Sequence, residues 1–221
     1  MEELQDFFDC ADSYVERVRT SGRKGWLAAF RDATLFKVAY SWGLRRNEVR
    51  LLELSDFGAN PLAPEFGRRG VLRVRFGKAM KGSAPKPRSV LTVFGWAAEC
   101  VDEWIYEIRP RLQFDDGSLW PTERGGTVGY TRIGQHFRDI RNEAGLPKEV
   151  TFHSFRRSYV THLIEEGFDA RFVQEQVGHE YASTTALYTG VSSDYRVRSL
   201  RRSLDKLSGS MLNVGRDKGK R

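Results

Sequence analysis

Apolar residues recur at helical spacing along most of this 221-residue chain, and one central stretch breaks that period. There, Leu72, Val74 and Phe76 alternate with polar residues, which is the pattern of a half-buried strand. After a connection rich in Gly and Pro, residues 89–93 have the composition of a partner strand. We therefore predict a mainly α-helical (α+β) fold with one small antiparallel β-sheet.

The helices are predicted from the apolar spacing together with Gly, Pro and capping residues. Asn47 is expected to cap the third helix, and Pro110 follows the end of the fourth. Trp42 and Trp96 are expected in the core, and His136 on the exposed face of its helix. The predicted helices span residues 4–18, 26–42, 47–54, 96–108, 131–144, 152–166, 170–177, 183–188 and 193–207.

Composition narrows the class of partner. The formal net charge is +7, and a basic chain suits a polyanion, because Lys and Arg that neutralise phosphates release counterions from nucleic acid. The two cysteines form no CxxC motif, the four histidines form no HExxH motif, and no apolar stretch reaches the length of a membrane span. We expect no metal, no cofactor and a reducing cytoplasm, in a protein of bacterial, phage or mobile-element origin.

Several segments carry residues suited to phosphate chemistry, and the first to consider lies just after position 150. His153 and Arg156 are three apart and therefore share a face of the predicted helix. They lie in its first turns, where free backbone N–H groups and the helix dipole favour an anion. Other segments with such residues are Gly43-Leu44-Arg45, Gly77-Lys78, Gly178-His179 and Thr184-Thr185-Ala186-Leu187-Tyr188.

Five segments resemble, in order, the motifs of the tyrosine recombinase (phage integrase) family. The step of nine residues from His179 to Tyr188 agrees as well. One HxxR motif would be a weak signal, whereas five in the right order are a specific one. The matches are 43–48 to GLRxxE, 153–156 to HxLR (with Phe155 for Leu), 161–163 to THL, 178–179 to GH and 184–188 to TTxxY.

The resemblance implies the catalytic-domain fold of that family and a site-specific recombinase. Such an enzyme cuts and rejoins double-stranded DNA through a 3′-phosphotyrosine and a Holliday junction, as a tetramer on two DNA sites. No cofactor or metal takes part. The catalytic residues carried over are Arg45, Lys78, His153, Arg156, His179 and Tyr188.

Each residue type suits its implied role. Arg45 and Arg156 would clamp the phosphate, because a guanidinium stays charged and its planar fork fits two oxygens. Tyr188 would be the nucleophile, and Lys78 would protonate the departing 5′-oxygen. His153 and His179 would contact the phosphate, the former also as acid or base.

One departure from the family pattern leaves the identity of the catalytic lysine open. Nine residues separate Lys78 from Arg88 where the family often has a tight turn, so Lys81 or Lys86 could be the catalytic lysine instead. Glu48, at the end of the first motif, is expected to orient Arg45 rather than react.

The domain organisation is also read from the resemblance. Residues 1–192 are expected to form the catalytic domain, 193–208 a helix that docks on a neighbouring protomer, and 209–221 a basic flexible tail. The family's separate core-binding domain is missing before the first motif, which favours a truncated chain over a minimal recombinase.

Two other functions remain possible at this point. A type IB topoisomerase-like nicking–closing enzyme shares much of the chemistry, although the motifs at His153 and His179 resemble recombinases more closely. A DNA-binding regulator that lost catalysis would share the fold. His162, although it matches the family's THL segment, is interpreted as a structural residue.

Overall fold

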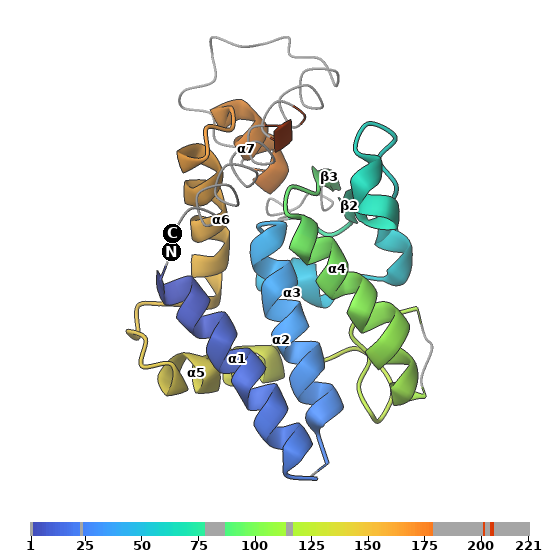
Figure 1. The fold of residues 1–221 in the computed structure, drawn as a ribbon, viewed down its shortest axis with the longest axis vertical. Helices are drawn as coiled ribbons and strands as arrows, with labels where there is room; N and C mark the ends of the chain where they lie inside the picture. Colours follow the sequence, from blue (N-terminus) through green and yellow to red (C-terminus); the bar gives the residue numbers. More distant parts are fainter. Residues whose placement is uncertain are drawn as a thin grey trace, which may run out of the picture.

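The computed structural model describes residues 2–22, 24–77, 87–113, 117–178, 201 and 204–205. Within these ranges the chain is mainly α-helical with one small antiparallel sheet, as predicted (Figure 1). The α-helices are α1 (Glu2–Thr20), α2 (Trp26–Ser41), α3 (Arg46–Arg50), α4 (Gly95–Glu103), α5 (Tyr130–Glu143), α6 (Phe152–Glu165) and α7 (Ala170–Val177). Short helical turns are η1 (Leu54–Asp56), η2 (Pro64–Arg69), η3 (Trp104–Ile108) and η4 (Arg109–Leu112), and the strands are β1 (Phe57–Gly58), β2 (Val71–Val74) and β3 (Arg88–Leu91).

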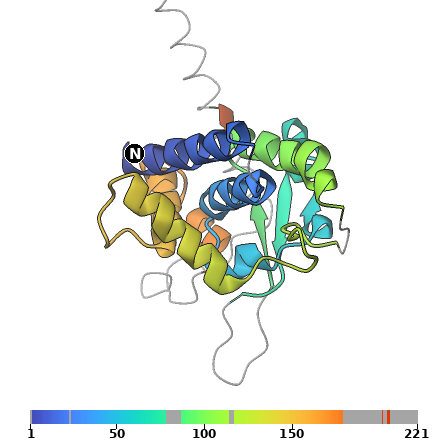
Figure 2. The same cartoon turned by 90° about the horizontal axis from the view of Figure 1, so that it is seen from below.

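Helix α2 forms the centre of the molecule. Figure 2 shows it surrounded by α1, α4, α5, α6 and the sheet, and most of its residues are buried. A helix that is apolar on nearly every side is stable in water only when other elements cover it. Four aromatic rings fix this packing: the Phe7 ring of α1 lies 5.4 Å from Phe36, 5.0 Å from Phe137 and 5.2 Å from Phe155, measured between ring centroids.

The sheet confirms the predicted hairpin and adds a strand to it. Strands β2 and β3 pair antiparallel with Leu72 opposite Val90 and Val74 opposite Arg88. The short β1 pairs with the other edge of β2, in a segment for which no strand was predicted. Helix α7 joins the sheet through Gln176, whose side chain accepts from the N–H of Leu91 (2.9 Å) and donates to the carbonyl of Leu91 (2.8 Å).

The predicted start of one helix is wrong. Helix α3 starts at Arg46 and is capped by Arg45 rather than Asn47, because Glu48 reaches back to the backbone N–H of Arg45. The helix predicted over 96–108 is confirmed, as α4 continued by the π-helical turn η3.

Two predictions of burial are also wrong, while Trp42 is fully buried as predicted. Trp96 is 39% exposed and stacks at the surface on Tyr40 and Phe94, because it occupies the first turn of α4, at the edge of the core. His136 is only 4% exposed and pairs with Asp32 of α2, because α5 packs across α2.

The predicted helices at 183–188 and 193–207 lie outside the described residues, except for Arg201, Leu204 and Asp205, which are helical. A guanidinium nitrogen of Arg201 lies 2.9 Å from Glu65 Oε1, and Leu204 packs against a small cluster of apolar side chains that includes Phe66. Docking of this segment on a second protomer stays a prediction.

Candidate functional site

The described part of the site is built around the buried carboxylate of Glu48. Gly43, with φ of 58°, ends α2 and turns the chain so that Arg45 caps α3. Glu48 Oε2 accepts from the backbone N–H of Arg45 (2.9 Å), and Glu48 Oε1 accepts from Arg45 Nη1 (2.7 Å). The Arg45 side chain keeps 28% of its surface exposed, whereas that of Glu48 keeps 2%. The carboxylate therefore fixes an arginine whose guanidinium still faces solvent.

Arg88 at the start of β3 is a second partner of Glu48, and the sequence did not nominate it. Its Nη1 and Nη2 donate to Glu48 Oε1 (3.0 Å) and Oε2 (2.8 Å), and its Nε donates to the carbonyl of Gln176 (3.0 Å). Gly178, with φ of 62°, ends α7 here, and a Cβ at this glycine would lie 2.9 Å from Arg88 Cδ. The glycine of the GH motif thus leaves room for Arg88 between α7 and the sheet.

Arg156 of α6 is the third arginine around Glu48. Its Nη1 donates to the carbonyl of Gly43 (2.8 Å), its Nη2 donates to the carbonyl of Val177, and Nη1 lies 4.0 Å from Glu48 Oε2. The side chain is 2% exposed, and its buried Nε has no partner among the described residues. Arg156 therefore holds together the C-terminal ends of α2 and α7, and one of its donors remains available.

Charge in this cluster is unbalanced, because Arg45, Arg88 and Arg156 share the carboxylate of Glu48, the one carboxylate that the described part of the chain places against them. Burial alone would raise the pKa of Glu48, but hydrogen bonds and charges of Arg88 and Arg45 lower it to about 2. Burial, followed by the charges of Arg45 and Arg88, lowers the pKa of Arg156 to about 9. Glu48 and Arg156 are thus both ionised at neutral pH, and three guanidinium groups around one carboxylate leave a local excess of positive charge that an anion would stabilise.

His153 lies one turn before Arg156, in the first turn of α6, as the three-residue spacing predicted. Partial burial, and then the charges of Arg156, Arg45 and Arg157, lower the pKa of the His153 imidazole. A neutral imidazole at this position can accept a proton near neutral pH. Arg45 and His153 both line a cavity of about 410 Å³ between α3, α5 and α6.

The structure thus brings together three of the predicted site residues, Arg45, His153 and Arg156. The other predicted residues, which are Lys78, His179 and Tyr188 with the alternatives Lys81 and Lys86, lie outside the described residues. Arg88 directly precedes the strand predicted over 89–93 and could have been found by extending it one residue, because alternation then places it on the same face as the buried Val90.

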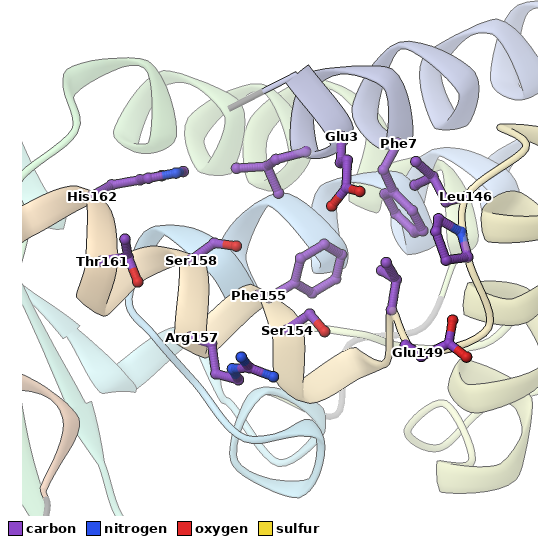
Figure 3. Close-up of a pocket in the computed structure, with 13 residues that line it drawn as sticks. Glu3, Phe7, Leu146, Glu149, Ser154, Phe155, Arg157, Ser158, Thr161 and His162 are labelled. Carbon is purple, nitrogen blue, oxygen red and sulfur yellow. The ribbon is translucent and has the colours of Figure 1, made fainter.

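A second cavity, of about 380 Å³, lies between α1 and α6 (Figure 3). It is lined by residues of α1, the loop before α6 and α6 itself, and its charged groups include the acidic Glu3 and Glu149. His162 at its edge lies 2.8 Å (Nδ1) from Tyr40 Oη, which fits the structural role predicted for it. The mixed charge of this cavity makes it a poor site for a polyanion.

Other classes of site were sought across the described ranges. There, no group of three or more His, Cys, Asp or Glu side chains is placed to hold a metal ion. Over the same ranges, no helix is long and apolar enough to cross a membrane.

Solved structures share this fold. XerH, in a crystal structure of the site-specific recombinase bound to its difH substrate before cleavage, is 25% identical with a TM-score of 0.58, over 81% of this chain and 46% of that one. A lambda integrase dimer bound to a COC′ core site has a TM-score of 0.55 at 15% identity, over 87% of this chain and 50% of that one, which shows likeness of fold alone.

Curated sequences agree with the structures. Tyrosine recombinase XerC of Shewanella oneidensis is 30% identical over 73% of this chain, and XerD of Corynebacterium glutamicum is 32% identical over 74%. The chain covers 47% and 49% of these relatives, about half of their length. The sequence profile described as "Phage integrase family" matches residues 26–194. Since that match spans well over half of the chain, the protein belongs to the phage integrase family.

Proposed function

We propose that this chain is the catalytic part of a site-specific DNA recombinase that cuts and rejoins DNA strands through a 3′-phosphotyrosine on Tyr188. The observation that carries the proposal is the convergence of Arg45, Arg88 and Arg156 on the one carboxylate of Glu48, next to His153. An excess of fixed guanidinium charge fits a phosphodiester, whose negative charge increases in the transition state.

In the proposed step, the phenolic oxygen of Tyr188 attacks the phosphorus of a DNA phosphodiester. A bond from that oxygen to phosphorus forms, and the bond from phosphorus to the 5′-oxygen breaks. The phenolic proton passes to a base, and a proton from an acid makes the departing oxygen a free 5′-hydroxyl. Because the phosphotyrosine conserves the energy of the broken bond, the reverse attack by a 5′-hydroxyl rejoins the strand without ATP.

The arginines would act in two different ways. Arg45, which keeps part of its guanidinium exposed, contacts a nonbridging oxygen directly. Arg156 offers its unpaired Nε while its other nitrogens are bound to the carbonyls of Gly43 and Val177. Arg88 is a positioning residue, because it donates to both oxygens of Glu48, the carboxylate that fixes Arg45.

His153 is the candidate base, since its lowered pKa keeps it neutral at physiological pH. Lys78 is the candidate acid, with Lys81 and Lys86 as alternatives. His179 would donate a hydrogen bond to a nonbridging oxygen.

The partners and wider organisation follow from family membership. We propose double-stranded DNA as substrate, a tetramer on two DNA sites as the working assembly, no cofactor, and a cytoplasmic location. Residues 1–192 would be the catalytic domain, 193–208 the helix that docks on a neighbouring protomer, and 209–221 a basic tail. A core-binding domain, which the family carries before the catalytic domain, would complete the grip on DNA.

Covalent trapping tests the reaction. The chain and its Tyr188→Phe variant are mixed with end-labelled, nicked duplexes that cover candidate target sites, and the products are separated on a denaturing gel. A protein-linked band that is absent with the variant is the expected result. If the full-length protein binds a site but forms no such band there, the catalytic proposal is wrong.

The same assay identifies the acid. Lys78→Ala, Lys81→Ala and Lys86→Ala are compared on a normal duplex and on one with sulfur in place of the 5′-bridging oxygen. Since a thiolate leaves without protonation, the sulfur substrate is expected to restore cleavage by one variant only. Restoration of none, or of all equally, would contradict a lysine acid.

A further inference from the structure

The cavity beside Arg45 carries more positive charge than one phosphate needs. Among the described residues, its charged and titratable lining groups are four arginines, His153 and Tyr130, and no Asp or Glu lines it. One of these arginines, Arg141, is 9% exposed and bonded to backbone carbonyls of Lys148 and Val150. Among the described residues, neither Arg46 nor Arg138 donates a hydrogen bond to a backbone carbonyl as Arg141 does.

Arg46 follows Arg45 directly but extends the other way, toward α5. Its guanidinium lies 3.6 Å from the centroid of the Tyr130 ring, so the ring face fixes its position. Among the described residues it has no hydrogen-bond acceptor and no carboxylate partner, so its donors are free for a ligand.

Gly134, one turn after Tyr130, makes room for this arrangement. A Cβ built on Gly134 would overlap Arg46 Nη1 and would lie 3.7 Å from Arg138 Nη1. The two guanidinium groups therefore approach the same point on α5. The contact of Arg138 that the structure describes is with the neutral Gln135 (Nη2 to Oε1, 2.7 Å). Arg46 and Arg138 thus bring two positive charges close to Gly134, and none of the described residues that line the cavity is a carboxylate. A bound anion would stabilise such an arrangement.

We propose that Arg46 and Arg138 form a second phosphate site, which binds a backbone phosphate of the cleaved DNA strand next to the phosphate held by Arg45. The inference rests on the proposed function, because it takes DNA as the ligand. The side chain of Arg45 extends toward Glu48 and that of Arg46 toward Tyr130, so the two neighbouring arginines point apart. In the proposal, each therefore contacts a different one of two consecutive phosphates. Such a contact fixes the register of the strand and carries no sequence preference of its own.

The test measures how DNA affinity depends on salt, because the slope counts the phosphates that the protein neutralises. Binding of a labelled duplex of arbitrary sequence is followed by fluorescence anisotropy at increasing NaCl concentration. In Arg46→Gln the slope of log K against log salt is expected to be shallower by about one. The matched control is Arg19→Gln, which loses the same charge from an exposed position on α1 and is expected to keep the slope.

A variant that moves the Arg46 guanidinium without changing the charge of the protein tests whether its position matters. Gly134→Ala displaces only the flexible end of Arg46, so the fold is retained while the slope falls as in Arg46→Gln. Its control is Gly129→Ala on the residue before α5, where a Cβ meets nothing within 4 Å. Because Arg46 and Arg138 would share one phosphate, the double variant with Gln at both is expected to lose no more slope than Arg46→Gln.

Each outcome decides a different question. If Arg46→Gln keeps the slope and only lowers the melting temperature, Arg46 is a structural residue and the second site is wrong. A double variant that loses about two units of slope would also contradict a shared phosphate. If the unaltered chain shows no salt-dependent binding of DNA, the proposed function itself fails. If the unaltered chain binds DNA in a salt-dependent way but Arg46→Gln has the same slope, only the second phosphate site is refuted.

Discussion

Two of the buried carboxylates that the structure describes with basic partners, Glu48 and Asp32, are used differently. Glu48 is surrounded by Arg45, Arg88 and Arg156. Asp32 of α2 accepts from Arg31 (2.7 and 2.8 Å at Oδ1) and lies 2.8 Å from His136 Nδ1 at Oδ2. The first cluster borders a cavity, whereas every side chain of the second is at most 5% exposed.

The difference lies in the balance of charge. One carboxylate faces one guanidinium at Asp32, and the remaining oxygen is occupied by an imidazole. Such a pair needs no further ligand, and Arg31 adds a bond to the carbonyl of Pro121 (3.1 Å) that ties α2 to the loop before α5. At Glu48 one carboxylate faces three guanidiniums. The charge-balanced cluster at Asp32 only holds helices and loops together, whereas the cluster at Glu48, with its excess of positive charge, can also bind an anion.

The largest expected effect is the loss of Glu48. Glu48→Gln removes the carboxylate that three arginines share, and breaking a buried ion pair of this kind costs about 3–5 kcal/mol. The free energy of unfolding, measured by urea denaturation, is expected to fall by that amount. Inorganic phosphate at constant ionic strength is expected to restore part of it, because an anion that binds only the folded state stabilises it.

Asp32→Asn is the matched control for that prediction. It is also expected to be destabilised, because Arg31 loses its charged partner in the core. Phosphate should restore little, since no excess of positive charge surrounds this site. Equal restoration of both variants would remove the distinction between the two clusters.

The next largest effect is on rate rather than stability. Arg45→Gln removes a guanidinium that is partly exposed, so the free energy of unfolding should change by less than about 1 kcal/mol. The rate of phosphotyrosine formation is expected to fall about 10²–10³-fold, as for the loss of one preorganised donor to a developing charge. Single-turnover cleavage of a nicked duplex measures the rate.

Arg156→Gln gives the contrast within the same cluster. It leaves the carbonyls of Gly43 and Val177 without their buried donor, so both rate and stability should fall. If Arg156→Gln were as stable as Arg45→Gln, the structural part of its role would be refuted.

How much of these clusters could be predicted depended on how local each feature is. The common face of His153 and Arg156 follows from helical spacing alone, and the helix predicted over 26–42 is confirmed as α2, which ends just before Gly43. Arg88 depends on the register of β3 and on where α7 ends, neither of which a local pattern shows.

The same reason explains the errors. The two-residue β1 is too short to show alternation, and it exists because β2 offers a free edge. His136 lies on the face of α5 that carries Ile133, Phe137 and Ile140, so its spacing was compatible with burial. Only the packing of α5 on α2, where Asp32 offers an acceptor, decides that a polar ring fits there.

A smaller effect is expected at His136. His136→Leu leaves Asp32 Oδ2 without its partner, and an unsatisfied buried acceptor costs about 1–3 kcal/mol. Thermal denaturation measures the loss, and salt-dependent DNA binding is the control. Binding per folded molecule should be unchanged, because the second cluster is closed to solvent. A shallower salt slope in this variant would mean that the two clusters are coupled.

The smallest expected effect is the acid dependence of Glu48. The pKa of this carboxyl is about 2 in the folded chain, against its ordinary value of 4.5. A folded-state pKa below the unfolded one gives stability that is present above pH 4.5 and is lost as pH falls toward about 2. Between about pH 4.5 and 3.5 the free energy of unfolding of the unaltered chain should fall by roughly 1 kcal/mol more than that of Glu48→Gln, since one proton per molecule corresponds to about 1.4 kcal/mol per pH unit.

Glu48→Gln keeps a residual acid dependence, because the pKa of Asp32 is lowered too. Burial alone would raise that pKa, but the hydrogen bond from His136 and the charge of Arg31 lower it. Urea denaturation at several pH values measures the difference, and parallel curves for the two proteins would show that Glu48 does not titrate as the three arginines require.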